Sequence, residues 1–561
     1  MLRHIKGLLG LFTVVVVVSL FSASLTPGQT GTSGINGIIT DAQGRAVAGA
    51  KVTLTNLGTN ATRTTQTTES GAYAFDLIPP ADYRIEIEAT GFRKSVVDNA
   101  KALIGKQTEI SIRLDVGTVS QTVEVSISGA NALINTQDAS LGNVLENNQI
   151  SQLPLEGRNL VDLLSLQPGA TREGYVTGAR ADQSNVTLDG VDINNAQTGN
   201  AALAGGNLII GGLDTDKGNI VTGPVLRLNT EAIEEFRVTT ANGNANQGRS
   251  AGAQVNLVTK TGSNSIHGAA FGFYRGTPFE ANDWFSNASG VPRTPLVRNT
   301  FGGALGGPIV KDKLFFFYSF EGRRDATATS VAEIVPLKSL GQGTINYTYC
   351  ADVACNSTPG ASLNLTQNQQ AFTDTGINQA ALDALAAAAT KYPANDTSVG
   401  DGLNTGGFRF NAATPEALNS HVARLDYTIN SKQSLFLRGN VIYDHQALPQ
   451  FFPDTASPQV WSHPRGLAVG HTWTIGNNWV NNFRYGFTRQ AFTQGGDSNG
   501  NDISFRFVFQ PNGQTHSLSR TTPVHTLGRR STDGPSSCHP RPVRGHPGFA
   551  RSRARHQHRC Q

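Results

Sequence analysis

The second half of the chain repeatedly alternates apolar and polar residues, and this pattern constrains the fold more than any other feature. The stretch 254–275, QVNLVTKTGSNSIHGAAFGFYR, contains two extended segments joined by a polar turn. Period-two alternation recurs in the stretches 420–430, 433–443 and 482–489. Successive side chains of a β-strand point to opposite faces, so each stretch predicts a strand with one apolar face. Many such strands behind an export signal suit the wall of a bacterial outer-membrane barrel.

The two faces of these strands differ in their chemistry. The alternation begins with Ala269, Phe271 and Phe273, and it continues with Leu425 and Tyr427. The intervening polar residues include Arg424, Asp426, Arg438 and Asn440. We expect the polar face to line a watery lumen and the aromatic residues to meet lipid or the membrane interface.

Composition agrees with a barrel and excludes a helical membrane protein. Of the 561 residues, 61 are Gly and only 15% are charged, and the mean hydropathy is −0.24. A bundle of membrane-spanning helices would be far more apolar, whereas a barrel alternates its faces and cancels the hydropathy signal. The length predicts about three or four domains. We therefore predict a mainly β chain with an N-terminal β-sandwich, a mixed α/β plug and a partial transmembrane β-barrel.

Residues 1–28 have the pattern of a secretory signal peptide. A basic start with Arg3, His4 and Lys6 precedes an apolar run of 14 residues at 8–21. That run is shorter than the ~20 apolar residues that a spanning helix needs. The small residues at 22–24 suit a cleavage site, with an uncleaved anchor as the alternative.

Residues 33–115 read as a small all-β domain. Short alternating runs separated by turn residues are enough for a sandwich of two sheets. The phrases GIITDAQGRAVAGAKVTLTN and ESGAYAFDLIPPADYRIEIEATGFR resemble the carboxypeptidase regulatory-like domain. The resemblance implies no peptidase activity. Related sandwiches include carbohydrate-binding modules, so contact with a sugar is a further expectation.

Residues 118–262 contain three blocks that resemble, in this order, the plug of a TonB-dependent transporter. The blocks are QISQLPLEGRNLVDLLSLQPGA at 149–170, SNVTLDGVDINN at 184–195 and EAIEEFRVTTANGNANQGRSAGAQVNLVTKTGSN at 231–264. Leu160, Leu163 and Leu164 in the first block share one helical face. Together with the junction at 254–275, the blocks resemble the Oar-like TonB-dependent outer-membrane transporters.

A short extended segment ahead of these blocks resembles a TonB box. Its candidate residues are Thr122, Val123, Glu124 and Val125, and Gln121 stands where the family often has an acid. An extended peptide with alternating apolar residues can add its backbone to the edge strand of a partner. An ordinary linker strand is the alternative.

The resemblance implies a receptor or transporter that imports a solute through the outer membrane. Its expected partners are TonB, outer-membrane lipid and an unidentified solute, with a carbohydrate or a peptide as candidate classes; no nucleic acid is expected. Residues 265–527 would supply the N-terminal part of the barrel. They hold about seven or eight strands, whereas the family closes its barrel with about 22, so we expect an incomplete, non-functional barrel because an open edge is costly in lipid.

The polar stretch 325–418 is expected to form an extracellular loop that contains one helix at 379–392. Cys350 and Cys355 lie in this loop, five residues apart. A disulfide is the natural interpretation in an exported protein, with free thiols as the alternative. A metal site would need two more ligands nearby, and the sequence offers none.

The chain ends in a basic segment of different composition. Residues 528–561 carry eight Arg and one acidic residue, a balance of +7, so the net charge of +4 leaves −3 for the rest of the chain. Arg, Pro, His and Gly dominate there, which predicts disorder. An abrupt change after TTPVHTL suggests a frameshift product, and a genuine basic tail that binds lipopolysaccharide phosphates or nucleic acid is the alternative.

The sequence predicts no enzyme, and no catalytic, cofactor or metal site. The GxSxG at 248–252 lacks the strand before it and the helix after it that a nucleophile elbow requires. The acidic run at 214–218 resembles a calcium loop only faintly, since Val225 stands where a bidentate Glu is needed. A different class of function is a secreted or cell-surface protein that uses the sandwich for carbohydrate binding or adhesion.

Overall fold

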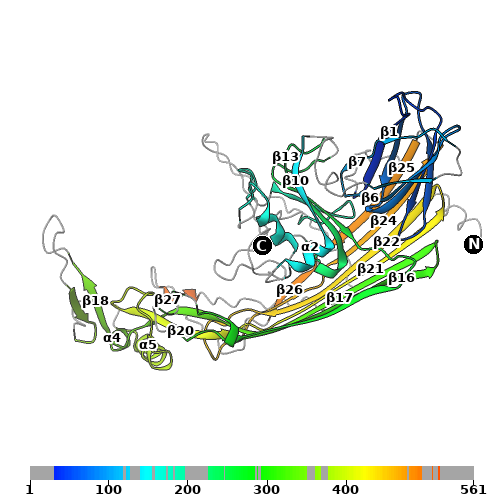
Figure 1. The fold of residues 1–561 in the computed structure, drawn as a ribbon. Helices are drawn as coiled ribbons and strands as arrows, with labels where there is room; N and C mark the ends of the chain where they lie inside the picture. The colour runs from blue at the N-terminus through cyan, green and yellow to red at the C-terminus, as the bar shows by residue number, and fades with distance from the viewer. Residues whose placement is uncertain are drawn as a thin grey trace, which may run out of the picture. The chain divides into compact units, whose positions relative to one another are not determined.

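The computed structural model describes residues 31–117, 122–126, 139–153, 158, 160–171, 175–180, 183–195, 225–244, 247–282, 284, 287, 292–349, 360–367, 377–476, 479–495, 508–509 and 516–517 (Figure 1). No helix among them is long and apolar enough to cross a bilayer. The elements below belong to one compact unit, Met1–Asn501, and a second unit, Asp502–Gln561, contains the paired strands β27 (Val508–Phe509) and β28 (His516–Ser517). The predicted signal peptide and basic tail lie outside the described residues.

The N-terminal domain is a pair of facing β-sheets. The first sheet is formed by β1 (Ser33–Thr40), β4 (Ala72–Ile78), β7 (Gln107–Glu109) and β8 (Ile112–Arg113). The second has the order β3-β2-β5-β6-β9, with β2 Lys51–Asn56, β3 Thr62–Gln66, β5 Ala81–Glu88, β6 Lys94–Ala102 and β9 Thr122–Ser126. Ile35 of the first sheet and Ile85 of the second are fully buried in one shared core. The alternating runs therefore fold as the predicted sandwich.

The next region is a mixed α/β layer around a second core. Its sheet has the order β10-β13-β14-β11-β12, with β10 Leu141–Glu146, β11 Asn185–Leu188, β12 Val191–Asp192, β13 Ile233–Ala241 and β14 Gln254–Thr259. The short helices are α2 (Asn147–Gln152), η2 (Leu160–Leu166) and η4 (Thr230–Ala232). Leu160, Leu163 and Leu164 are all buried against this sheet, as their helical spacing predicted.

A long curved sheet of ten strands follows. Its continuous wall is β15 (His267–Gly276), β16 (Leu296–Val310), β17 (Leu314–Pro336), β21 (Glu416–Asn430), β22 (Gln433–Ala447), β24 (Arg465–Ile475) and β25 (Trp479–Arg489). The strands β20 (Thr405–Ala413), β23 (Gln459–Ser462) and β26 (Phe492–Gly495) extend it at one end. Each wall strand is antiparallel to its neighbours. Among the described strands, β15 pairs only with β16 and β25 only with β24, so the sheet is open.

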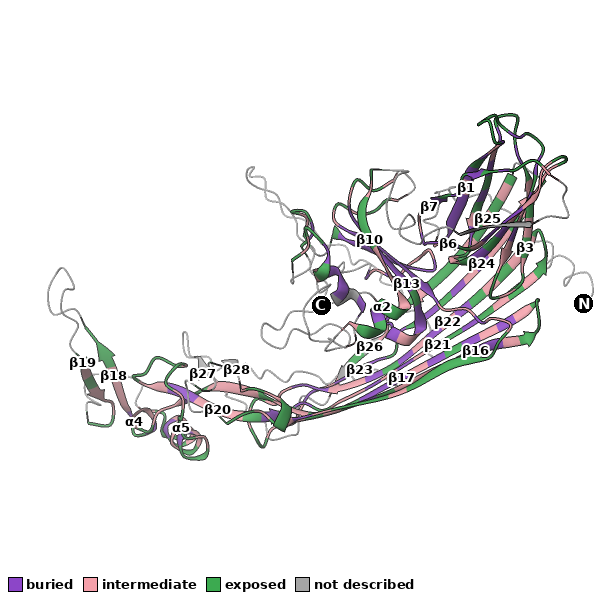
Figure 2. Ribbon diagram, in the orientation of Figure 1, coloured by how far each residue is buried: buried purple, intermediate pink, exposed green. Residues whose placement is uncertain are grey.

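The wall has the two faces that the alternation predicted. Leu425 and Tyr427 are about 40% exposed, whereas Arg424, the residue before Leu425, is buried. On β22, Leu437 is exposed and Arg438 is only 1% exposed. Buried and exposed bands alternate along these strands in Figure 2. The polar face is buried because the mixed α/β layer from β10 to β14, called the plug region below, packs against it.

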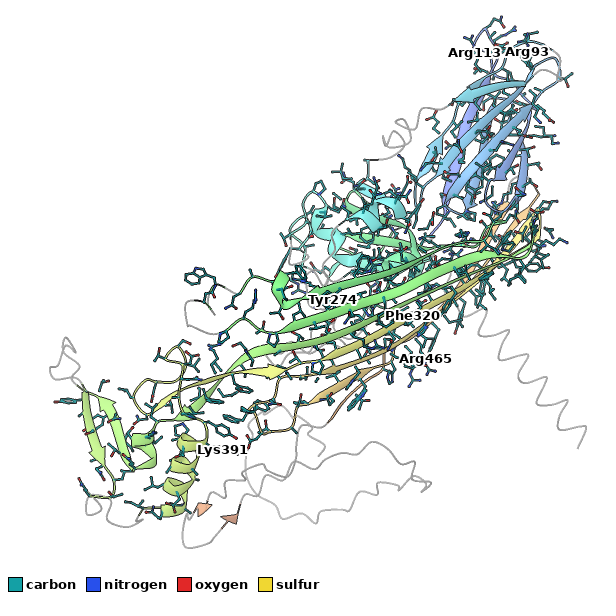
Figure 3. The ribbon with its side chains drawn as sticks, turned by 60° about the horizontal axis from the view of Figure 1, so that its bottom comes forward. Arg93, Arg113, Tyr274, Phe320, Lys391 and Arg465 are labelled. Atoms are coloured by element: carbon teal, nitrogen blue, oxygen red, sulfur yellow. The ribbon has the colours of Figure 1, made fainter. Side chains whose placement is uncertain are left out.

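Phe271 and Phe273 contradict the expectation that the aromatic residues face lipid. The guanidinium of Arg158, a residue of the plug region, lies 4.5 Å from the ring centre of Phe271 and 5.0 Å from that of Phe273. These rings therefore lie on the inner face, where they make cation–π contacts. Tyr274, the next residue of β15, points to the opposite face and is largely exposed (Figure 3).

The stretch 325–418 is more ordered than the predicted loop. Strand β17 continues to Pro336 and pairs with β20 over nine positions, 328–336 with 405–413. The region also contains the helices α4 (Lys338–Gly341) and α5 (Gln379–Lys391) and the hairpin of β18 (Thr344–Thr348) and β19 (Gly360–Asn364). The predicted helix is confirmed. The strands were missed because a hairpin outside the bilayer needs no continuous apolar face, so its sequence reads as polar loop.

The outer face of the wall can be tested by a charge at Leu437. Replacement of Leu437 by Arg should destabilise the lipid-inserted chain by about 2–4 kcal/mol if this position lies near the bilayer midplane. Replacement by Val should cost less than about 1.5 kcal/mol, because it removes one methylene group and introduces no charge. Urea unfolding in lipid vesicles measures both variants, and equal stability would place Leu437 away from lipid.

Candidate functional site: the contact between plug and wall

The tip of the β11–β12 hairpin is a two-residue turn made by Asp189 and Gly190. Leu188 pairs directly with Val191 across it. Both turn residues have positive φ, 50° and 75°. A type I′ hairpin turn needs this left-handed conformation at both positions, and an Asp-Gly pair adopts it readily. The turn therefore projects the Asp189 side chain beyond the end of the ladder.

The Asp189 carboxylate is buried between the plug and the wall. On the plug side, the backbone N–H and the hydroxyl of Thr259 each donate to it at 2.9 Å. On the wall side, Arg424 Nη1 donates to Oδ1 at 3.1 Å, and Arg438 Nε lies 2.8 Å from Oδ2. Asp189 is 3% exposed, so these ion pairs are much less screened than surface pairs.

A third wall arginine completes the cluster. Arg484 on β25 donates to the main-chain carbonyl of Asp189. The guanidinium carbons of Arg424 and Arg484 lie 4.9 and 5.5 Å from the ring centre of Phe436. Arg424 and Arg438 are direct register partners on β21 and β22. Two like charges in such a position repel each other. Asp426 on the wall pairs with Arg424, and the carboxylate of the plug pairs with both arginines.

A second cluster joins plug and wall with the opposite polarity. Here the wall supplies carboxylates and the plug supplies arginines. Arg158 Nε donates to Glu321 on β17 at 2.9 Å, and Arg227 Nη2 donates to Asp444 on β22 at 2.9 Å. Arg227 also lies 3.9 Å from Glu321. The plug is therefore bound to the wall by charges of both signs.

The sandwich contacts the plug through the loop after β6. The N–H of Ile104 donates to Glu235 at 2.7 Å, and Arg237 donates to the carbonyl of Ile104 at 2.9 Å. Lys101 and Glu146 form a salt bridge at 2.8 Å. Burial raises the pKa of Glu235 to about 8, because removal from water disfavours its charged form. The charge on this contact therefore depends on pH in the neutral range.

The predicted coupling segment lies on the sandwich. Residues 122–126 form β9, whose backbone pairs in parallel with β6, with Lys94 opposite Thr122 and Asp98 opposite Ser126. The structure thus gives the segment an extended backbone, as the prediction requires. It does not bring Thr122, Val123, Glu124 and Val125 together with the clusters between plug and wall, so the TonB-box assignment stays a prediction.

The other sequence candidates show no arrangement for chemistry. Ser250 of the GxSxG donates to the carbonyls of Gln183 and Ala253, at 3.0 and 2.9 Å, and β14 rather than a helix follows it. Cys350, Cys355 and the acidic run at 214–218 lie outside the described residues. In the part of the chain that the structure describes, no three His, Cys, Asp or Glu side chains gather as metal ligands.

The convergence of Asp189 with the three wall arginines was not predicted. Period-two alternation placed Arg424 and Arg438 on the inner face, and the motif SNVTLDGVDINN indicated a plug. No signal in one sequence links Asp189 to Arg424, which lies 235 positions away. The available hint was the presence of arginines on a face that would otherwise line a lumen.

The Asp189 contact can be tested by removing its charge. Replacement of Asp189 by Ala should destabilise the plug against the wall by about 3–5 kcal/mol, because it leaves Arg438 buried without its counter-charge, while Arg424 keeps its pair with Asp426. Arg249→Ala is the control, since the ion pair of Arg249 with Asp192 is exposed and should contribute about 0–1 kcal/mol. Urea unfolding with limited proteolysis of the plug measures both, and equal losses would contradict the assignment.

The contact through Glu235 should depend on pH. Its pKa is raised from 4.5 to about 8, so the folded state holds a proton that the unfolded state releases. The contribution is fully present below pH 4.5 and is lost as pH rises to 8, with a slope approaching ~1.4 kcal/mol per pH unit. Glu235→Gln cannot titrate, so the parent should lose stability relative to this variant as the pH rises from 5 to 9. A constant difference in thermal unfolding would refute the raised pKa.

Comparison with known proteins agrees with this architecture. The family model described as "Outer membrane beta barrel domain" matches residues 258–546, and the carboxypeptidase regulatory-like domain matches residues 34–115. The TonB-dependent transporter Oar of Myxococcus xanthus is 25% identical over 334 residues, which cover 56% of this chain and 29% of the relative. The chain therefore spans less than a third of that relative's length.

Two solved structures are similar in part. The outer membrane transporter YddB from Escherichia coli has a TM-score of 0.40 at 11% identity, over 64% of this chain and 40% of that chain. The ferric enterobactin receptor from Pseudomonas aeruginosa has a TM-score of 0.35 at 11% identity, over 63% and 42%. The family match covers more than half of the chain, which therefore belongs to the outer-membrane β-barrel family as an Oar-like member with an N-terminal carboxypeptidase regulatory-like domain.

Proposed function

We propose that the chain supplies the sandwich, the plug and part of the barrel wall of a TonB-dependent outer-membrane transporter or receptor for solute uptake. The observation that carries the proposal is the contact of the Asp189 turn with Arg424, Arg438 and Arg484. It holds a separate α/β layer against the inner face of a barrel wall. A layer in this position closes the lumen at rest and opens it by moving.

The chemistry of the contact suits a plug that must be released. Charged groups form both clusters. Apolar contacts lie beside them, where Ala232 packs with Phe317 and Val422 and where Ile442 of β22 joins the plug core. An ion pair regains hydration when it separates into a water-filled lumen, so its rupture costs less than exposure of an equally large apolar surface. We infer that a pull on the segment before the plug separates these pairs one after another.

The solute is expected to meet the region beyond the wall first. An aromatic cluster gathers there, where the rings of Tyr392 and Phe452 stack with centres 4.2 Å apart and Phe408 lies 5.5 Å from Tyr392. Lys391, at the end of α5, is labelled in Figure 3. Stacked rings beside charged groups can contact sugar rings or peptide side chains, so a carbohydrate or a peptide remains the expected class of solute.

Carbohydrate binding by the sandwich has less support. Sugar-binding surfaces commonly present an exposed aromatic ring, which has a large apolar face. Residues 31–117 are described throughout, and their aromatic residues Tyr73, Phe75 and Tyr83 are no more than 5% exposed, while Phe92 packs against the same core. The secreted-protein alternative predicts a soluble product, whereas the transporter predicts a heat-modifiable product in the outer-membrane fraction.

Coupling to TonB can be tested at residues 119–126. Deletion of these residues should abolish retention of the full chain on an immobilised periplasmic domain of TonB, because the backbone needed for strand addition is lost. In place of deletion, Val123→Pro with Val125→Pro should give the same loss, since Pro has no N–H to donate.

Val123→Thr with Val125→Thr is the matched control, because Thr keeps a β-branched side chain and a backbone donor. It should bind like the parent. If deletion leaves binding unchanged, the box assignment is wrong. Each variant is first checked for heat-modifiability, so that loss of folding is not mistaken for loss of binding.

A further inference from the structure

The segment between the sandwich and the plug is already part of a sheet. Strand β9 pairs in parallel with β6 over five positions, from Lys94 with Thr122 to Asp98 with Ser126. The sheet order β3-β2-β5-β6-β9 places β9 at its end. One side of the β9 backbone is thus occupied by β6, and among the described strands none pairs with the other side.

The strand that holds β9 is itself firmly anchored. On its other side β6 pairs with β5, and Val97 on β6 is fully buried in the core of the sandwich. Charged pairs tie the two strands at the surface, between Arg84 and Asp98 and between Lys94 and Glu86. Two residues beyond the end of β6, Ile104 makes its two hydrogen bonds to the plug. Strand β6, with which β9 pairs, is therefore held in place by both the sandwich core and the plug.

An edge strand is a template for another strand, because its outer N–H and C=O groups are free to pair. A flexible peptide loses about 1–2 kcal/mol of backbone entropy for each residue that it fixes on binding. A segment that is already extended on β6 has lost this freedom before the partner arrives, and such pre-organisation raises affinity. Most proteins cover or shorten such edges, whereas in this chain the edge strand β9 contains the candidate coupling residues.

We propose that the sandwich has a function of its own in coupling: it presents residues 122–126 as an edge strand, to which a strand of the periplasmic TonB domain adds without displacing β9 from β6. This inference rests on the proposed function, since it takes TonB as the partner. It goes further by assigning the docking surface to the sheet β3-β2-β5-β6-β9 and by excluding a free, unstructured box as the binding form.

The first measurement compares the full chain with a free peptide of residues 118–130. A purified periplasmic TonB domain is the probe, and calorimetry in detergent gives both dissociation constants. The full chain should bind at least tenfold more tightly than the peptide, because only the chain holds the segment extended. Equal or weaker binding by the chain would overturn the inference. Binding by neither would remove the proposed coupling itself, so the two failures are distinguishable.

The second measurement uses a reversible staple between register partners Asp98 and Ser126. Asp98→Cys with Ser126→Cys is made in a chain whose four native Cys are replaced by Ser, and Asp98→Cys alone is the matched control. The pair of Asp98 with Arg84 is exposed, so its loss should matter little. The oxidised staple keeps β9 on β6, and TonB affinity should stay within threefold of the reduced form.

Loss of TonB binding on oxidation, with recovery after reduction, would show that the partner takes the place of β6 and would overturn addition at the outer edge. The comparison of oxidised and reduced forms of one protein excludes misfolding as the cause. The single-Cys control should respond to neither treatment.

Discussion

The contact on which the architecture depends is the buried carboxylate of Asp189 among three arginines of the wall. Burial of charges is costly, and their mutual attraction repays the cost only where the geometry is good and the remaining groups are hydrogen-bonded. Thr259 supplies those hydrogen bonds from inside the plug. The contact therefore adds less to net stability than its number of ion pairs suggests. Its larger effect is on position, because a displaced plug would leave charges buried without partners.

The reversal of polarity between the two clusters strengthens this effect on position. At one level the wall is cationic, with Arg424 and Arg438, and at another it is anionic, with Glu321 and Asp444. A plug shifted along the wall would bring like charges together at both levels. Electrostatic complementarity thus selects one register even where it contributes little net affinity.

Much of the fold could be predicted because its periodicities are local. Leu425 and Arg424 alternate in exposure as the pattern required, and Leu160, Leu163 and Leu164 share a buried face. The prediction failed where a distant segment decides the environment. Phe271 and Phe273 look like lipid-facing residues until Arg158 is placed against them, and β20 looks like a loop until its partner β17 is known. The pairing of Asp189 with Arg424 failed for the same reason, since neither residue reveals its partner.

The order of elements along the chain connects the sandwich to the movement of the plug. Strand β9 is held by β6, β6 leads within two residues to Ile104, and Ile104 is bonded to Glu235 and Arg237 on β13. β13 in turn pairs with β14, whose last residue, Thr259, binds the Asp189 carboxylate. A force applied at β9 therefore has a route through paired strands and the side-chain hydrogen bonds of Glu235, Arg237 and Thr259 to the contact that holds the plug, in addition to the covalent chain. The step from β6 to Ile104 is covalent and the other steps are hydrogen bonds, so a pull at β9 would load the ion pairs around Asp189 by this route only while the sandwich remains docked on the plug.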